Sequence, residues 1–379
     1  MKFIKTLPAV IALTFLLFNS SCDTPEKLLK SSDLDYKYKK AMQWYGKKQY
    51  YKCIPVFEEL MGLYKGTKST EDIYYYYSLA NFKQGDYIIA AYHLKNFYDL
   101  YPNNEHADEC LYLHAKSYEK LSPTYELEQT YTYKALEAYM LYMSNFYDAK
   151  RTDSCNIAIS KMRKKLEKKA LSNAELYYKI GHFRAAATSF EQLLETYPDI
   201  DNTERIYFMI VKANQKFAQN SIPSKKAERY SHVISSYTTF KRRFTSSKYL
   251  EEATLYEQQS HFQTVKGLLE HGQTAPLGER ERIYSKCIYE AGARKALITD
   301  HKTQVKCDAI AEQANFLIVK NHFLIAEEMR GAAKSQPLQQ TVKSYITFAA
   351  QFKNSKYARE ADKMYRTATK ALEKLKENG

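Results

Sequence analysis

One cysteine stands where its thiol could be modified covalently. Cys22 follows an apolar run, Leu7–Phe18, and the small or polar residues 19–21, and two lysines precede the run. A basic start, a short apolar run and small residues before a cleavage point are the pattern of a secretory signal peptide. A cysteine at the first position after cleavage indicates lipoprotein processing, in which the acylated thiol belongs to the new amino terminus. We therefore predict a signal peptide over residues 1–21 and a covalent lipid on Cys22.

The cleavage box admits a second interpretation, because Asn19 stands where leucine is usual. Ordinary cleavage near Ser21 would leave a soluble secreted protein. The apolar run itself is too short for a spanning helix, which needs roughly 20 residues. One acyl chain binds a membrane only marginally, whereas two or three hold a protein there. If Cys22 carries them, the rest of the chain need not contribute to the anchor.

No other residue pattern predicts catalysis or metal binding. The chain lacks the G-x-S-x-G and H-E-x-x-H motifs and any Gly-rich phosphate loop, and its nine histidines are scattered. The five cysteines after Cys22 are an odd number, widely spaced and without a C-x-x-C pair, so we expect buried free thiols rather than disulfides. We expect no enzyme activity and no cofactor besides the lipid.

The remaining sequence predicts helices arranged as repeats. Only 11 Gly and 9 Pro occur in 379 residues, as expected where tight turns are few. A small residue, large apolar residues four and seven positions later and a proline five further on occur twice, after a Gly-x-aromatic triplet at 85–87 and at 181–183. The two copies are Ala90, Leu94, Phe97 and Pro102, and Ala186, Phe190, Leu193 and Pro198.

This spacing is the signature of the tetratricopeptide repeat (TPR), a helix-turn-helix unit of about 34 residues. Degenerate copies are Cys53-Phe57-Leu60, Ala135-Tyr139-Tyr142 and Val233-Tyr237-Phe240, with an inserted loop at Leu121–Glu128. We predict an all-α superhelix of about five to six such units, with a groove lined by the first helices. The predicted groove residues of the first two units are Tyr38, Met42, Tyr45, Tyr75, Leu79 and Phe82.

The chain also repeats itself over a longer distance. A shift of 108 residues aligns Phe208–Ala253 with Phe316–Ala361 without a gap, and 16 of the 46 positions are identical. A further TPR-like unit is therefore expected near the carboxyl terminus, and Gln273–Glu279 is the best candidate for a break between the copies. We divide the chain into a tether, 22–35, a repeat array, 36–257, and a helical extension, 258–379.

The formal net charge is +14, and two basic strips contribute to it, Lys161–Lys169 and Lys241-Arg242-Arg243. On helices such strips are more often solvated faces than binding patches. The weaker alternative is attraction to anionic lipid or to an acidic partner. Nucleic acid is not an expected partner for an exported chain.

The tether and the repeats together resemble the BamD family, the TPR lipoproteins of the outer-membrane protein assembly machinery, and are most similar to Bacteroidetes-type forms. The resemblance covers about residues 22–257. The segments that carry it are Glu26–Ser31, Tyr38–Trp44, Tyr50–Leu60, Lys83–Phe97, Gly181–Pro198 and Asn220–Tyr230.

This resemblance implies a role in assembly rather than a reaction. Members of the family are anchored by lipid in the outer membrane, face the periplasm, contact the POTRA domains of the barrel protein BamA and receive unfolded outer-membrane proteins. By that analogy, the six groove residues are candidate contacts for a substrate. The alternative is a TPR lipoprotein that binds glycan or peptidoglycan, or that organises another envelope complex.

Overall fold

A computed structural model of the chain describes residues 24–66, 69–146 and 150–377, and all regular structure within these ranges is helical. The described residues form two compact units, one ending at Lys169 and the other beginning at Ala170. The predicted signal peptide and Cys22 lie outside the described residues.

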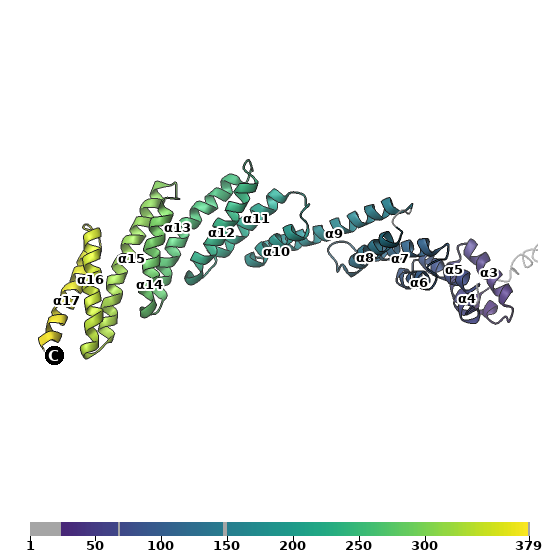
Figure 1. Ribbon diagram of the computed structural model, residues 1–379, viewed down its shortest axis with the longest axis horizontal. Helices are drawn as coiled ribbons and strands as arrows, with labels where there is room; N and C mark the ends of the chain where they lie inside the picture. Colours follow the sequence, from purple (N-terminus) through teal and green to yellow (C-terminus); the bar gives the residue numbers. More distant parts are fainter. Residues whose placement is uncertain (1–23, 67–68, 147–149, 378–379) are drawn as a thin grey trace, which may run out of the picture. The chain divides into compact units, whose positions relative to one another are not determined.

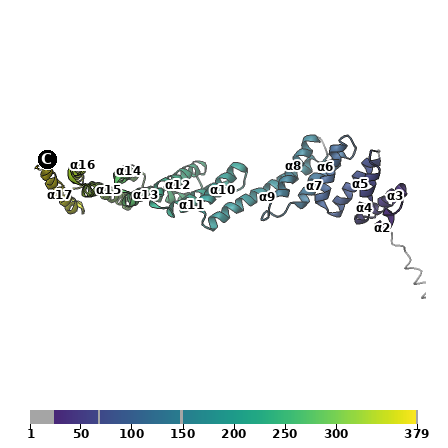
Figure 2. The same cartoon turned by 90° about the horizontal axis from the view of Figure 1, so that it is seen from below.

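In the first unit, the successive helices α3 to α8 pack side by side, and α2 packs against α4 (Figure 2). The unit comprises α2 (Pro25–Leu29), α3 (Leu34–Gly46), α4 (Tyr50–Leu63), α5 (Ser69–Gln84), α6 (Tyr87–Leu100), α7 (Ala107–Leu121), α8 (Thr130–Asn145) and the first part of α9 (Thr152–Lys179).

Within the second unit, considered by itself, neighbouring helices also pack side by side, and α11 to α17 lie in chain order (Figure 1). It comprises the end of α9, α10 (Phe183–Thr196), α11 (Thr203–Gln219), α12 (Pro223–Arg243), α13 (Leu250–Thr274), α14 (Leu277–Lys295), α15 (His301–Glu328), a short 3-10 helix η1 (Gly331–Lys334), α16 (Ser335–Gln351) and α17 (Ala358–Glu377).

The predicted repeat positions form the core of the helix pairs. All fifteen small and large positions of the five copies are buried, and Gly85 and Gly181 have φ of 98° and 85° at the turns between the helices. This left-handed backbone is the conformation that only glycine adopts without strain. The all-α repeat class is confirmed, and α3 to α16 form seven successive pairs within the described residues, one more than the upper prediction.

The additional pair is α13 and α14. In this pair the small residue lies on the first helix and the large residue that it contacts lies on the second. Gly272 lies on the first helix, and a Cβ built on it would lie 2.3 Å from Cε1 of Tyr284 on the second helix. The break predicted at Gln273–Glu279 contains the turn between these helices, which is residues 275–276, while its two ends belong to α13 and α14. The predicted border at 257/258 lies within α13, which packs against both α12 and α14.

The sequence duplication is also a duplication of contacts. The ring of Phe208 stacks on Tyr249 at 4.6 Å, and the ring of Phe316 stacks on Tyr357 at the same distance. Equivalent ion pairs join α11 to α13 and α15 to α17, namely Lys212–Glu252 at 3.1 Å and Lys320–Glu360 at 2.9 Å. Helices α15 to α17 therefore reproduce the packing of α11, α12 and the start of α13.

The structure also bears on the predictions for the cysteines and for the first basic strip. All five described cysteines are free and buried, as predicted. The basic strip Lys161–Lys169 is not a purely solvated face, because two of its lysines bond within the fold. Lys165 Nζ donates to Ser122 Oγ at 2.6 Å and Lys169 Nζ donates to the Leu127 carbonyl at 2.8 Å. These lysines therefore hold the loop inserted between α7 and α8.

Candidate functional site

The six predicted groove residues lie on the first helices of the first two pairs. Tyr38, Met42 and Tyr45 are on α3, and Tyr75, Leu79 and Phe82 are on α5. Tyr75 and Leu79 are buried, and the other four are half-buried. All six pack in the hydrophobic clusters of these helices.

Tyr76, which the sequence pattern did not select, lies at the centre of this region. Its ring centroid is 5.2 Å from that of Tyr45 and 5.2 Å from that of Tyr75, both in edge-to-face contact. Tyr76 is close enough to Tyr38 to contribute to the raised pKa of Tyr38. We define the tyrosine surface as Tyr38, Tyr45 and Tyr76, three half-buried side chains contributed by α3 and α5.

The hydroxyl groups of the tyrosine surface have no hydrogen-bond partner within the described residues. Burial, and secondarily Asp72 and Tyr76, raise the pKa of Tyr38. Burial is also the main cause that raises the pKa of Tyr45, with Tyr50 next. These two hydroxyls therefore remain protonated at neutral pH and can each donate one hydrogen bond and accept others.

Tyr75 differs from this surface because its polar group is already paired. Its hydroxyl donates to Glu109 Oε2 at 3.0 Å, and its ring stacks on His106 with centroids 3.9 Å apart. Burial first, and then Glu109, raise the pKa of Tyr75. In this structure Tyr75 packs α5 against the start of α7, and a contact with a partner stays a prediction.

The other three predicted residues support the surface from within the fold. Leu79 is only 7% exposed, and Met42 packs against the core of α3 and α4. Phe82 meets Tyr87 edge to face at 5.6 Å, across the turn that contains Gly85. A partner could reach the half-buried Met42 and Phe82 more readily than Leu79.

A buried lysine fixes the short helix α2 beside this region. Lys37 is 2% exposed, and its Nζ donates to the Leu29 carbonyl at 2.8 Å and to both carboxylate oxygens of Glu59 at 3.0 and 2.9 Å. Leu28 of α2 is buried in the same cluster as α3 and α4. The end of the predicted tether is therefore docked on the first helix pair.

None of the described helices is both long enough and apolar enough to cross a membrane. In the same ranges, no group of three or more His, Cys, Asp or Glu side chains is placed to hold a metal ion.

Successive helix pairs of this type define an all-α helical-repeat protein of the TPR class. The chain belongs to the YfiO family of outer membrane lipoproteins, whose family model matches residues 31–230. The match begins between α2 and α3 and ends within α12, so α13 to α17 lie beyond it.

A curated relative agrees with this assignment. The chain is 23% identical over 208 residues to a putative outer membrane protein assembly factor BamD of Aquifex aeolicus (strain VF5), covering 54% of this chain and 68% of the relative. The resemblance to the BamD family is thereby confirmed.

Comparison with solved structures finds other TPR proteins. The TPR2AB-domain:pHSP90 complex of yeast Sti1 aligns at 11% identity and a TM-score of 0.31, covering 74% of this chain and 98% of that one. The C-terminal part of a TPR protein from Cytophaga hutchinsonii aligns at 12% identity and a TM-score of 0.23, covering 87% and 99%.

Proposed function

We propose that this protein is a non-catalytic scaffold for the assembly of outer-membrane β-barrel proteins, held in the outer membrane by lipid on Cys22 and facing the periplasm. Its partners are a BamA-like barrel protein with POTRA domains and unfolded outer-membrane proteins. Membership of the YfiO family of outer membrane lipoproteins supports the location in the outer membrane. The observation that carries the binding role is the tyrosine surface, with three hydroxyls unpaired within the described residues.

The chemistry of this surface suits an extended polypeptide. Tyrosine rings offer apolar area at a low cost in conformational entropy, and their hydroxyls can bond to the backbone amides and carbonyls of a strand. Such contacts do not depend on the sequence of the bound strand, so one surface can serve many substrates. The role of Tyr38, Tyr45 and Tyr76 is to hold the strand, and no reaction is assigned to them.

The experiment combines Tyr38→Phe, Tyr45→Phe and Tyr76→Phe in one variant. Each substitution keeps the ring and removes only a hydroxyl that has no partner within the described residues, so helix content and melting temperature are expected to stay unchanged. Affinity for a fluorescent peptide copied from the last strand of an outer-membrane barrel protein is expected to fall at least tenfold, because three hydrogen bonds are lost at about 0.5–1.5 kcal/mol each.

The matched control removes three exposed tyrosine hydroxyls from the second helices of the first three pairs, α4, α6 and α8, in the variant Tyr51→Phe, Tyr92→Phe and Tyr133→Phe. Affinity within twofold of the unmodified protein is expected. If both triple variants bind the peptide equally well, the tyrosine surface is not the substrate site.

The partner assignment is tested by capturing the full chain from detergent-solubilised envelopes through a carboxyl-terminal tag. Recovery of a stoichiometric barrel protein with POTRA domains supports the assembly role. Recovery of peptidoglycan fragments or of unrelated envelope proteins, without that barrel protein, would replace it with the glycan-binding or organising alternative.

A further inference from the structure

A groove of about 600 Å³ lies between α12 and α14, with α13 as its floor. Its recessed part is apolar, because Leu268 on the floor and Ile283 on the α14 side are each 5% exposed. Hydroxyl groups of Ser231 and Thr264 also line it. We call it the α12–α14 groove, and most of it is built from α13 and α14, which lie beyond the family match.

The positive charges of the α12–α14 groove exceed its negative ones. Glu228 is paired with Lys225 at 3.0 Å, and Glu290 is paired with Arg294 at 2.7 Å. Arg282 and Lys286, which lie one helical turn apart on α14, are exposed and have no ion-pair partner within the described residues. Both line the groove, so two cations there remain available to a ligand.

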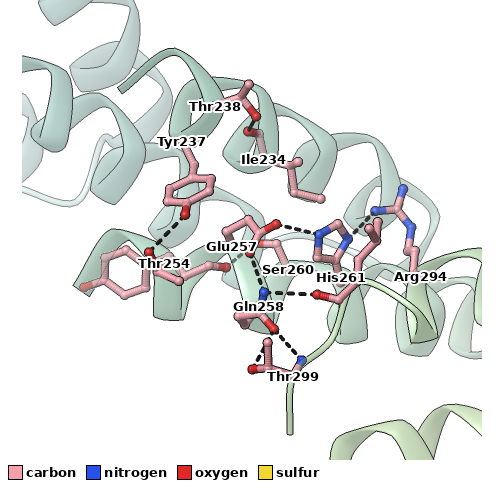
Figure 3. Close-up of polar contacts among 12 residues, drawn as sticks. Ile234, Tyr237, Thr238, Thr254, Glu257, Gln258, Ser260, His261, Arg294 and Thr299 are labelled. Atoms are coloured by element: carbon pink, nitrogen blue, oxygen red, sulfur yellow. Dashed lines mark hydrogen bonds and ion pairs between the residues drawn. The ribbon is translucent and has the colours of Figure 1, made fainter. Parts of the chain in front are cut away.

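Polar contacts hold a third lining cation of the groove, Arg294, and Figure 3 shows them. Its Nη1 lies 3.1 Å from Nδ1 of His261, which is 3% exposed. A guanidinium group can only donate, so Nδ1 accepts and the proton of a neutral His261 is on Nε2. Nε2 then donates to Glu257 Oε1 at 2.8 Å, and this chain of contacts holds Arg294 in one orientation.

A second contact fixes the position of the α14 wall. Gln258 Nε2 donates to the Leu297 carbonyl at 3.1 Å, and Gln258 Oε1 accepts from the Thr299 amide at 2.9 Å (Figure 3). The segment after α14 is thereby tied to α13. The three cations therefore lie on a helix whose position is fixed in the absence of a ligand. Such preorganisation lowers the entropic cost of binding.

We propose that the α12–α14 groove binds an acidic, partly apolar segment of another polypeptide. Side chains one turn apart on a helix are about 5–6 Å apart, close to the spacing of residues i and i+2 in an extended strand, roughly 6.6 Å. Two acidic residues of a strand can thus meet Arg282 and Lys286. The groove has the size of a site for a ligand much larger than one phosphate group.

A polypeptide fits these observations better than a membrane surface. A bilayer contacts side chains that project from a protein, whereas the apolar groups here are recessed between two helices. A segment with carboxylates flanking an apolar residue fills the recess and neutralises the cations at once. The proposal does not depend on the role of the tyrosine surface.

The test uses the full chain in detergent and a fluorescein-labelled peptide of repeated Glu-Leu-Glu triplets, followed by anisotropy at low salt. The variant Arg282→Glu with Lys286→Glu is expected to bind at least tenfold more weakly than the unmodified protein. Because both side chains are exposed, the helix content of the variant is expected to be unchanged. A peptide of Gln-Leu-Gln triplets is expected to bind at least tenfold more weakly than the acidic one.

The matched control is Lys302→Glu with Lys306→Glu, which makes the same change of charge at the same spacing on exposed positions of α15. Acidic-peptide affinity within twofold of the unmodified protein is expected. Equal losses in both double variants would mean that net charge alone attracts the peptide, and would overturn the proposal. So would a loss of binding to anionic vesicles in the groove variant with peptide affinity unchanged.

Discussion

Replacing Lys37 with methionine should release helix α2 from the first helix pair. Methionine keeps most of the buried aliphatic stem of the lysine and removes the ammonium group, so the change is mainly electrostatic. Three hydrogen bonds are lost, one to the Leu29 carbonyl and two to the Glu59 carboxylate. Leu29 is the last residue of α2, so the lost contact is the one that holds the end of that helix.

The size of the effect follows from the burial of the two charges. Removing one partner of a fully buried ion pair costs about 3–5 kcal/mol. The Glu59 side chain is 35% exposed, whereas that of Lys37 is 3% exposed, so water can solvate the carboxylate that remains. We therefore expect a cost of about 2 kcal/mol, which corresponds to an increase of about 30-fold in the opening equilibrium of α2.

Hydrogen exchange followed by mass spectrometry measures this opening directly, in the peptide that covers residues 24–33. Unfolding of the whole chain is a poorer readout, because helical repeats lose structure locally. Lys39→Met makes the same chemical change at an exposed position of the same helix and serves as the control. Glu59→Gln, which keeps one acceptor oxygen, is expected to have a smaller effect.

The double variant Lys37→Met with Glu59→Gln should cost clearly less than the sum of the single variants, because both remove the same contact. If Lys37→Met leaves the exchange of residues 24–33 at the level of the Lys39→Met control, the Lys37 contacts do not hold α2. Additive costs in the double variant would contradict the assignment of Glu59 as the partner.

Three further outcomes can be measured by urea unfolding or hydrogen exchange. Gly272→Ala should destabilise the α13–α14 packing by about 1–3 kcal/mol, because the new Cβ would lie 2.3 Å from Tyr284, whereas Gly292→Ala, with nothing within 4 Å, should stabilise α14 by about 0.5–1 kcal/mol; equal effects would contradict the packing. Burial lowers the pKa of His114 below its usual 6.5. As the pH falls below 6.5, His114 therefore binds a proton more readily in the unfolded chain than in the folded one, and the stability of the fold decreases. His114→Asn, which can still donate to the Ala91 carbonyl that His114 contacts, should reduce the loss between pH 7.5 and 5.5 by about 1 kcal/mol, and an unchanged slope would refute this. Tyr357→Ala should speed exchange in α17 and leave α10 to α12 unaffected, since repeats depend on their nearest neighbours; faster exchange throughout the second unit would speak against it.

The helix pairs that follow the usual order of residue sizes could be predicted from the sequence. In those pairs the small residue and the two large ones lie on the second helix, so one segment contains the whole signal. The α13–α14 pair distributes the signal over two helices, with Gly272 on the first and Tyr284 on the second. A search for the pattern within one helix could not find it.

The tyrosine surface was only partly predictable for a related reason. Tyr74 to Tyr77 are four identical residues in succession, and neighbouring positions on a helix point about 100° apart. A run of identical side chains has no periodicity that shows which of them faces the core. Packing against Glu109 and His106 buries Tyr75, and Tyr76 joins Tyr45 in the half-buried position.

Charged residues were the least predictable from the sequence. The strip Lys161–Lys169 has the composition of a solvated face, but Lys165 and Lys169 bond to a loop about 40 residues earlier in the chain. Such contacts depend on which loop packs beside the helix in the folded protein. The periodicity of the helix sequence contains no information about this tertiary contact.

The repeated contacts of the second unit make the start of α13 and the start of α17 interchangeable, because each packs in the same way on the helices before it. Because Phe208–Tyr249 and Phe316–Tyr357 stack alike, the start of α13 and the start of α17 present the same face to the helices they cover. Excising residues 254–361 would splice the end of α17 onto the start of α13 without altering that joint. Removing or repeating such a segment would shorten or lengthen the helical array. The first helix pairs would not be changed.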